Sequence, residues 1–415
     1  MTHRVEISRR REIDRRRVVI TGTGAVTSLG VGSQLLTDRW IAGESGILDG
    51  WSACRDFEPR TVMRQKEVRR TDRFTQLAIA AAEQALDEAG WNGTPAYRPD
   101  RVGCIVGTGV GGIATEEEQH TRLRERGPGA VSPLTIPMIM HNAAAGYLAM
   151  RHGWRGPTFS VASACATGGH AIGLALRTIQ SGDADAVLAA ASEAALTPLG
   201  TSSFQAMGVL SPTGRSLPFD ARRDGFVMGE GSGALLLEAA ETAEARGATV
   251  LGELLGYGAT ADAYHITSPD PEAEGAVRAI ESALEDAAVE PDDVDYVNAH
   301  GTGTELNDRV ETLALKRALG GAAGRIPVSS TKSVIGHLLG AAAVVEAVAT
   351  VHALRRRIAP PTAGFRERED GLDLDYVPVS RPLETGNGRA VALSNAFGFG
   401  GHNVVICLAA GRGNG

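Results

Sequence analysis

The sequence has few cysteines, no long apolar run and no net positive charge, and each absence argues against a class of protein. Only 4 of the 415 residues are cysteines, and none lies in a Cys-x-x-Cys pair. This usage argues against a disulfide framework or a cysteine zinc site and favours a reducing, cytoplasmic location. No apolar run approaches the roughly 20 residues that a membrane-spanning helix needs. A net charge of −8 gives no general case for nucleic-acid binding.

An arginine-rich segment precedes the first apolar run. It includes Arg9, Arg10 and Arg11, but it lacks the apolar stretch of a secretory signal. We expect residues 1–16 to be a disordered leader, with a nucleic-acid-binding arm as the alternative. Residues 410–415 are expected to form a short tail.

Glycine, in contrast, is abundant, with 52 residues, and this predicts many tight turns and close backbone contacts. Apolar strand-like runs that end in Gly/Thr turns occur at residues 18–20, 102–106 and 294–297, and helical periodicity occurs at residues 72–90, 169–180, 272–288 and 340–354. The alternation predicts an α/β fold with buried sheets. The repeated strand–turn unit indicates two related halves, residues 17–262 and 263–409. The seam is expected in the least regular stretch, residues 256–271.

Gly107, Gly109 and Gly112 match the dinucleotide-binding fingerprint after a strand. A dinucleotide-binding unit continues with a helix, a second strand and an acidic residue roughly 20 positions on. Here a charged segment follows instead, with no strand pattern up to Pro133. The match therefore gives little support for a nicotinamide cofactor.

Cys165 lies at a predicted junction between a strand and a helix. Residues 159–162 form a short extended run, and residues 166–180 carry apolar side chains at helical spacing. A thiol at a helix N-terminus meets unpaired amides and the helix dipole, which favour the thiolate. The alternative is a buried core cysteine, the common fate of a free thiol. Two histidine motifs downstream favour the nucleophile.

Those two motifs combine a histidine with small or hydroxyl side chains. His300 follows a strand and precedes two glycines and two threonines, which suits the rim of a pocket. Lys332 and His337 precede a small-residue helix that contains Glu346. A lysine and a histidine in such an apolar setting are expected to have shifted pKa values, as functional groups often do. A structural histidine remains the alternative for each motif taken alone.

The last motif is a glycine-rich segment around two phenylalanines, residues 394–403. Its glycines leave the backbone free to swing an aromatic ring such as that of Phe399. The alternative is an ordinary glycine-rich turn before a final strand, residues 404–408.

In this order, the runs Ala-Cys-Ala-Thr-Gly at Cys165, His-Gly-Thr-Gly-Thr at His300, Lys-Ser-Val-Ile-Gly-His ending at His337, and Gly-Phe-Gly-Gly at Phe399 resemble one family. It is that of the elongating β-ketoacyl-acyl carrier protein synthases, the KAS II type. The resemblance extends from about residue 17 to residue 409. It implies a thiolase-like α/β fold, in which two related halves build a layered α-β-α-β-α core. The initiating synthases have a Cys-His-Asn set, whereas the third member of the set in this sequence is a second histidine, His337.

The resemblance implies an acyltransferase with a two-part reaction. Cys165 would take an acyl chain from acyl carrier protein as a thioester, with the oxyanion held by the backbone N–H groups of Cys165 and Phe399. His300 and His337 would stabilise the enolate formed as malonyl-carrier protein loses CO2, which extends the chain by two carbons. Lys332 is expected to orient these groups, and Phe399 to act as a gate. No metal or redox cofactor is implied, because the 4′-phosphopantetheine arm belongs to the carrier protein.

The resemblance also assigns binding and structural positions. Contacts to pantetheine are expected from Thr267, Thr302 and Thr304. The acyl pocket is expected to be lined by Val110, Leu134, Thr135, Ile136 and Phe204. Structural roles are expected for Asp308 and Glu346. A structural monovalent cation is expected near Asn298, Glu346, Ser394 and Asn395.

A basic cluster, Lys66, Arg69 and Arg70, stands out on this acidic chain, and Arg126 is a further candidate for the same role. The cluster is either a solvated helix start or a docking patch for acidic carrier protein, and the resemblance favours docking. A homodimer is expected for a fatty-acid enzyme and a heterodimer with a chain-length factor for a polyketide enzyme. Neither nucleic acid nor a membrane is expected as a partner.

Two segments of the sequence favour different pathways. Asn307-Asp308 is closer to the ketosynthase subunits of type II polyketide synthases, whereas residues 332–340 are closer to the fatty-acid enzymes. We expect a fatty-acid elongator, with the polyketide subunit as the alternative. A non-catalytic chain-length subunit would lack the nucleophile. A degradative thiolase would need a second cysteine within the glycine-rich loop, and Cys407 lies beyond it.

Overall fold

The computed structural model describes residues 15–91, 96–385 and 388–411. The leader predicted for residues 1–16 lies largely outside this part of the chain. Its last residues are described, and Arg16 forms ion pairs with Asp185 (3.0 Å) and Glu241 (2.5 Å), so this end of the predicted leader is ordered. Residues 410 and 411 of the predicted tail belong to strand β13, which extends to Gly411, and its other residues lie outside the described part of the chain.

In the described part of the chain, an 11-stranded sheet runs in the order β4-β3-β5-β6-β1-β7-β13-β12-β8-β9, with β2 paired to β1. A separate two-stranded sheet joins β10 and β11. The strands are β1 (Val18–Thr27), β2 (Gly30–Val31), β3 (Val102–Gly107), β4 (Thr158–Phe159), β5 (Ala186–Glu193), β6 (Gly231–Ala239), β7 (Gly252–Ala261), β8 (Tyr296–Asn298), β9 (Val328–Ser329), β10 (Ile358–Ala359), β11 (Arg381–Pro382), β12 (Arg389–Gly398) and β13 (His402–Gly411).

The large sheet consists of two halves with the same topology. From the outer edge to the centre, one half runs β4, β3, β5, β6, β1 and the other β9, β8, β12, β13, β7. In each half the outer three strands pair in parallel and the inner pairs are antiparallel. The halves meet where β1 pairs with β7, at Val18–Leu254, Val19–Glu253 and Ile20–Gly252. The predicted internal relationship of two halves therefore takes the form of a repeated strand order.

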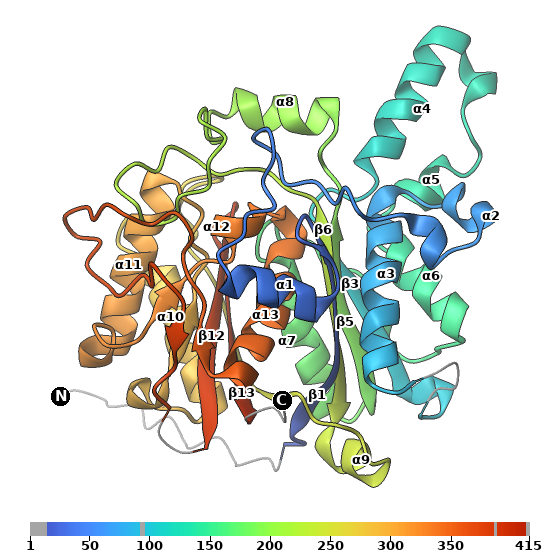
Figure 1. Cartoon of the computed structure of the whole chain (residues 1–415). Helices are drawn as coiled ribbons and strands as arrows, with labels where there is room; N and C mark the ends of the chain where they lie inside the picture. Colours follow the sequence, from blue (N-terminus) through green and yellow to red (C-terminus); the bar gives the residue numbers. More distant parts are fainter. Residues whose placement is uncertain (1–14, 92–95, 386–387, 412–415) are drawn as a thin grey trace, which may run out of the picture.

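The helices are arranged in three layers around the two halves (Figure 1). Helices α3 and α6 cover the outer face of the first half, and α10 and α11 cover that of the second. Helices α7 and α13 lie between the halves and contact strands of both. The helices are α1 (Ser33–Ile41), α2 (Gln65–Val68), α3 (Arg73–Glu88), α4 (Ile113–Arg126), α5 (Thr135–Ile139), α6 (Ala143–His152), α7 (Thr167–Gln180), α8 (Pro198–Ala206), α9 (Ala240–Ala245), α10 (Glu274–Ala287), α11 (Glu305–Leu319), α12 (Lys332–Ile335) and α13 (Ala342–Arg356). This is the predicted layered thiolase-like α/β fold.

Small and apolar side chains allow helices α7 and α13 to pack between the two halves of the sheet. Helix α13 is buried all round from Ala342 to Leu354, as expected of a helix packed between two sheets. It approaches α7 so closely that a Cβ atom on Gly168 would lie 2.7 Å from the backbone nitrogen of Val344. Glycine at this position therefore sets the distance between the two helices that carry the site.

The seam predicted for residues 256–271 is partly wrong, because its first residues belong to β7. The irregular appearance comes from glycines that serve packing: a Cβ atom on Gly258 would lie 2.0 Å from the carbonyl oxygen of Ala279, and one on Gly256 2.5 Å from that of Ala283. Both carbonyls belong to α10, so the glycines let this helix lie directly on the strand. The predicted boundary at residue 262 puts β7 in the first half, whereas the repeated strand order places β7 in the second half, where it pairs with β13 and meets β1.

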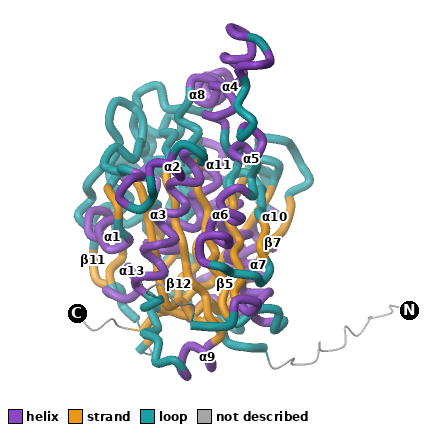
Figure 2. Tube along the Cα trace, turned by 90° about the vertical axis from the view of Figure 1, so that its right-hand side faces the viewer, coloured by secondary structure: helices purple, strands orange, loops and turns teal. Residues whose placement is uncertain are grey.

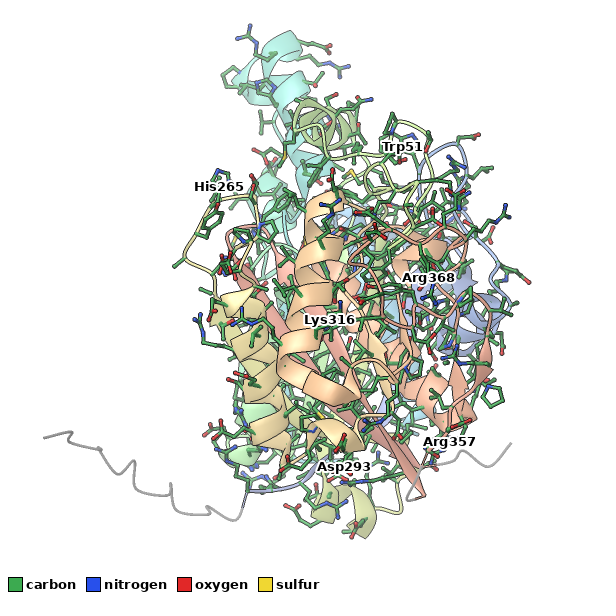
Figure 3. The ribbon with its side chains drawn as sticks, turned by 90° about the vertical axis from the view of Figure 1, so that its left-hand side faces the viewer. Trp51, His265, Asp293, Lys316, Arg357 and Arg368 are labelled. Atoms are coloured by element: carbon green, nitrogen blue, oxygen red, sulfur yellow. The ribbon has the colours of Figure 1, made fainter. Side chains whose placement is uncertain are left out.

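The loops that build the site gather at one end of the molecule. Figure 3 shows His265, in the loop between β7 and α10, at this upper end, whereas Asp293 and Arg357 lie toward the opposite end. Helix α4 and the turn after it project beyond the body (Figure 2). None of the described helices is both long and apolar enough to cross a bilayer.

Candidate active site

Cys165 lies two residues before α7, in a turn that follows β4; the predicted extended run 159–162 is shorter, because β4 ends at Phe159. The preceding Ala164 has a φ of 50°, a strained value for a side-chain-bearing residue. This turn presents the sulfur to the cavity, although the residue is only 8% exposed. Burial raises the pKa of the thiol to about 11, while Lys332 and the backbone N–H of Phe399 act to lower it. The helix N-terminus that is predicted to favour the thiolate is present at α7, and burial of the sulfur acts against it.

His337 is held by its backbone and oriented by a turn. Its N–H donates to the carbonyl of Val227 (2.7 Å), and its carbonyl accepts from Gly229 (2.9 Å). The backbone N–H of Leu339 donates to Nδ1 of His337 (3.1 Å), so the ring proton resides on Nε2. That Nε2 lies 3.1 Å from the sulfur of Cys165. The neutral ring therefore donates a hydrogen bond toward the nucleophile.

His300 is fixed in the same tautomer by a buried ion pair. The ammonium of Lys332 lies 2.5 Å from Oε1 of Glu346 and 3.3 Å from Nδ1 of His300. Because an ammonium only donates, Nδ1 of His300 accepts and Nε2 carries the proton. Burial and the charge of Lys332 hold the pKa of both His300 and His337 well below the usual range. Both imidazoles are neutral donors at neutral pH.

The three central side chains converge, with donor atoms of Cys165, His300 and His337 all within 4.8 Å of one another. Such a set is also a possible metal site, for which each imidazole must offer a lone pair. Here both Nδ1 atoms already accept hydrogen bonds and both Nε2 atoms carry protons. The donor set therefore suits a negatively charged oxygen better than a metal ion.

The loop with Phe399 is the hairpin turn between β12 and β13. The turn packs against the nucleophile, since a Cβ atom on Gly398 would lie 3.1 Å from the backbone nitrogen of Cys165, and the backbone N–H of Phe399 acts to lower the pKa of the thiol. The next residue, Gly400, donates from its N–H to the carbonyl of Ile266 (2.7 Å), which connects this turn to the loop after β7. The turn thus brings the backbone N–H of Phe399 close to the nucleophile, and both residues line the same cavity.

Two buried carboxylates hold the loop after His300. Asp308 accepts hydrogen bonds from the backbone N–H groups of Phe219 (2.7 Å) and Thr302 (3.1 Å), which agrees with its predicted structural role. Glu311, which the sequence analysis did not assign, accepts from the N–H groups of His300 (2.8 Å) and Gly301 (2.7 Å). Burial raises the pKa of Glu311 to about 7. The only signal in the sequence was an acidic residue on a helix just after the histidine motif.

A third carboxylate, Glu193 at the end of β5, was also missed. It accepts hydrogen bonds from the backbone N–H groups of Gly109 (2.7 Å), Val110 (3.2 Å) and Gly340 (3.0 Å), and from the hydroxyl of Thr108 (3.1 Å). One carboxylate thus joins the turn after β3 to the turn after His337. A single glutamate after an alanine-rich strand gave no sequence signal for this.

A cavity of about 640 Å³ opens onto Cys165, His300 and His337. The predicted pantetheine-binding residues Thr267, Thr302 and Thr304 line it, and so do Phe399 and the predicted pocket residue Phe204. The other four predicted pocket residues do not line it in this single chain: Val110, Leu134, Thr135 and Ile136. Val110 and Ile136 are 41% and 62% exposed.

The predicted docking residues lie at the surface, away from this cavity lining. Lys66 belongs to α2, Arg69 and Arg70 follow it, and Arg126 ends α4, which projects above α2 in Figure 1. All four are exposed, and none forms an ion pair with any part of the chain that the structure describes. Their charges are therefore available to a partner.

Three comparisons agree with this geometry. Residues 49–243 match the family model of the beta-ketoacyl synthase N-terminal domain, and residues 251–366 match that of the C-terminal domain. A 3-oxoacyl-[acyl-carrier-protein] synthase 2 of Synechocystis is 45% identical, covering 95% of this chain and 98% of the relative. The enzyme of that name from Coxiella burnetii is 41% identical, covering 95% of this chain and 99% of the relative.

Solved structures give the same result at lower identity. A beta-ketoacyl synthase from Burkholderia phymatum superposes with a TM-score of 0.87 at 32% identity, covering 96% of this chain and 100% of that one. A type II polyketide ketosynthase in complex with its acyl-carrier protein gives 0.87 at 32% identity, over 95% of this chain and 99% of that one. With its Cys-His-His set, its repeated sheet and these matches, the chain belongs to the beta-ketoacyl synthase family.

Proposed function

We propose that this protein is a 3-oxoacyl-[acyl-carrier-protein] synthase that elongates acyl chains in fatty-acid synthesis. The observation that carries the proposal is the convergence of two neutral histidine Nε2–H donors on the buried thiol of Cys165. Two such donors facing one nucleophile suit a reaction in which an acyl group rests on sulfur while a second thioester develops negative charge.

In the first half-reaction, the sulfur of Cys165 attacks the thioester carbonyl of an acyl-carrier protein. The new S–C bond forms, the C–S bond to pantetheine breaks, the pantetheine sulfur takes up the proton that the Cys165 thiol gives up, and the acyl group remains on Cys165. The oxyanion of the tetrahedral intermediate is stabilised by the backbone N–H groups of Cys165 and Phe399. Phe399 also turns aside to admit the acyl chain.

In the second half-reaction, His300 and His337 donate from Nε2 to the thioester carbonyl of malonyl-carrier protein. The bond to the carboxylate breaks, CO2 leaves, and its electron pair forms an enolate at the donors. The enolate carbon attacks the acyl carbonyl, the S–C bond breaks, and Cys165 leaves as a thiolate that takes up a proton from solvent to restore the thiol. The product is two carbons longer, and no redox cofactor is needed to balance the step.

Substrate delivery is supported by residues around the cavity and on the surface. Thr267, Thr302 and Thr304 offer hydroxyl groups along the path that the phosphopantetheine arm would take to Cys165. The exposed charges of Lys66, Arg69, Arg70 and Arg126 suit an acidic carrier protein. A cytoplasmic location is supported by the four cysteines, which are all unpaired.

A monovalent cation is proposed behind the site as a structural group. Oε2 of Glu346 and Oδ1 of Asn395 are buried oxygens without a hydrogen-bond partner, which fits a cation ligand set. Ser394 adjoins Asn395 on β12 and pairs in register with Asn298 on β8. The amide nitrogen of Asn298 faces Thr331, Thr350 and the carbonyl of Glu346, and its Oδ1 accepts a long hydrogen bond from the hydroxyl of Thr331 (3.4 Å).

A homodimer is proposed as the working state. Strand β4 is an edge of the large sheet, and its Phe159 is 38% exposed. Together with the exposed Val110 and Ile136, it leaves apolar surface that a second copy of the chain would cover. Light scattering of the purified chain tests this: a dimer mass is expected, and a stable monomer would contradict the proposal.

The alternative function, a polyketide ketosynthase subunit, is supported by similar solved structures. One of them is the ishigamide ketosynthase/chain length factor, which superposes with a TM-score of 0.86 at 32% identity. The fatty-acid assignment is preferred because the relatives named 3-oxoacyl-[acyl-carrier-protein] synthase 2 reach 45% identity. A requirement for a second, cysteine-less subunit before any condensation occurs would reverse this preference.

Mass spectrometry of Cys165 tests the function directly. The protein is incubated with carrier proteins that bear saturated acyl chains of graded length, and the adduct is mapped to the peptide of Cys165. Malonyl-carrier protein is then added, and release of CO2 and of a longer product is measured. We expect adducts in the wild type and none in Cys165→Ala. Normal elongation by Cys165→Ala would remove the nucleophile assignment.

A further inference from the structure

Glu193 is a buried carboxylate that the proposed reaction does not use. Its exposed fraction is 0%, and no basic side chain forms an ion pair with it in the described part of the chain. Three backbone N–H groups and the hydroxyl of Thr108 satisfy it instead. Burial raises the pKa of this carboxyl, and its four hydrogen bonds oppose that shift. The buried carboxylate of Glu193 is therefore stabilised by four hydrogen-bond donors rather than by a basic side chain.

The chain around Glu193 is shaped to bring those donors in. A Cβ atom on Gly109 would lie 2.5 Å from Oε2 of Glu193. One on Gly340 would lie 2.6 Å from the same oxygen and 2.5 Å from the nitrogen of Gly109. Only glycine fits at both positions, so two turns from different halves of the molecule meet at one carboxylate.

The bond from Gly340 matters because of its neighbour. Leu339 has a φ of 50°, in the left-handed region that branched side chains disfavour. The N–H of this strained residue is the donor that keeps the proton of His337 on Nε2. A strained backbone persists only where its surroundings hold it. The hydrogen bond from the next N–H, that of Gly340, to Glu193 is such a constraint.

We propose that Glu193 is a positioning residue that holds the turn at Leu339 and thereby locks His337 in the Nε2–H tautomer. Through Gly109 and Val110, the same carboxylate fixes the turn after β3. The effect on rate rests on the proposed condensing activity, whereas the effect on the tautomer does not. The charge of Glu193 does not explain its presence, because a carboxylate near Cys165 disfavours the thiolate.

The direct test is the nitrogen spectrum of His337 in the full-length protein labelled with ¹⁵N-histidine, with the signal assigned by its loss in His337→Ala. In the wild type we expect an unprotonated Nδ1 and a protonated Nε2. In Glu193→Gln, the side-chain amide opposes N–H donors with N–H groups of its own, so we expect a mixture of tautomers. CO2 release from malonyl-carrier protein should fall at least about tenfold, since a preorganised donor is lost.

Two control variants separate the parts of this argument. Thr108→Val removes one donor on the other turn and leaves the bond between Gly340 and Glu193, so the wild-type tautomer should persist. Glu238→Gln removes a carboxylate that is also 0% exposed, at the far end of the strand beside β5, where Glu238 pairs with Ala186. It should leave the tautomer and CO2 release unchanged. If Glu193→Gln does not fold, Glu193→Asp keeps the charge but shortens the reach, and the same tautomer mixture is expected.

A folded variant at Glu193 with a single Nε2–H tautomer and wild-type CO2 release overturns the proposal. So does faster alkylation of Cys165 with an unchanged tautomer, which would make Glu193 only a charge. A wild-type protein that releases no CO2 from malonyl-carrier protein contradicts the proposed function instead. In that case the ¹⁵N spectra still decide the role of Glu193.

Discussion

At the residue scale, the site depends on the placement of protons more than on charge. Lys332 and the N–H of Leu339 each occupy an Nδ1 atom, and this leaves two Nε2–H groups to face the cavity. The burial that keeps these imidazoles neutral also keeps the thiol of Cys165 protonated at neutral pH. The donors around the sulfur must therefore offset the cost of forming a buried thiolate.

The buried pair of Lys332 and Glu346 yields a first prediction. In Lys332→Met, the carboxylate of Glu346 stays buried without its cation, so the free energy of unfolding should fall by roughly 3–5 kcal/mol. The double variant Lys332→Met/Glu346→Gln should recover most of that loss, measured by urea unfolding. CO2 release should stay low in both, because Nδ1 of His300 has lost its donor. Recovery of CO2 release in the double variant would contradict the role assigned to Lys332.

The pKa of Cys165 yields a second prediction. With a pKa of about 11, the thiolate fraction should rise about tenfold per pH unit across the neutral and mildly alkaline range. The alkylation rate of Cys165 by iodoacetamide, followed by peptide mass spectrometry, should rise in the same way. His337→Ala removes a donor to the sulfur and should slow alkylation at each pH. A rate that levels off below pH 8 would show that the thiol is more acidic than burial allows.

The reacting residues could be predicted from the sequence, whereas the buried carboxylates that hold their loops in place could not. Cys165, His300 and His337 lie in short runs of small and hydroxyl residues, and such runs are visible in a sequence. Glu193 and Glu311 accept hydrogen bonds from backbone N–H groups. Nearly every residue has such a group, so no local sequence pattern marks these two carboxylates. Which N–H groups meet a given carboxylate depends on turns far along the chain, so only the structure could identify these two residues.

At the element scale, the site depends on how closely helices approach one another. The helices predicted from periodicity correspond to α3, α7, α10 and α13, since their apolar faces repeat every turn. The misjudged element is β7, where glycines that admit α10 resemble a loop pattern. Glycines on one face of a strand remove the alternation of apolar and polar side chains that identifies a strand in a sequence. A strand of this kind cannot be recognised from its local pattern.

Two glycines in helices allow a matched prediction. In Gly168→Ala, the new Cβ atom meets the backbone of α13 at 2.7 Å, so the free energy of unfolding should fall by roughly 1–3 kcal/mol. In Gly146→Ala, on α6, the Cβ atom meets nothing within 4 Å, and the helix should gain about 0.5–1 kcal/mol. Urea unfolding of the two variants measures both values. Equal effects of the same sign would contradict the tight contact between α7 and α13.

At the scale of the whole molecule, stability is tied to pH through buried histidines. His352 on α13 is 5% exposed, and burial lowers its pKa to about 4. The unfolded chain takes up a proton there near pH 6.5, whereas the folded protein does not do so until about pH 4. The unfolded state therefore binds more protons between these values, and stability is lost as the pH falls through this window.

The corresponding prediction compares pH dependence in two proteins. Between pH 7 and pH 4.5, the wild type should lose about 2–3 kcal/mol more stability than His352→Gln, which has no proton to take up. Urea unfolding at both pH values measures this. Comparing the change with pH cancels the fixed cost of replacing the contact between His352 and Thr23. An identical pH dependence in both proteins would remove His352 as a cause of acid sensitivity.

The pairing of β1 has a consequence for how the protein is made. Residues 18–26 of this strand pair with β6 at residues 232–239 and with β7 at residues 252–254. A ribosome adding about 5–20 residues per second takes roughly ten to fifty seconds to supply those partners. During that time the first strand has only the two-residue β2 to pair with, so it is a target for chaperones and for other nascent chains. The strand that later joins the two halves is thus the first to be synthesised, and it waits for partners at residues 232–254.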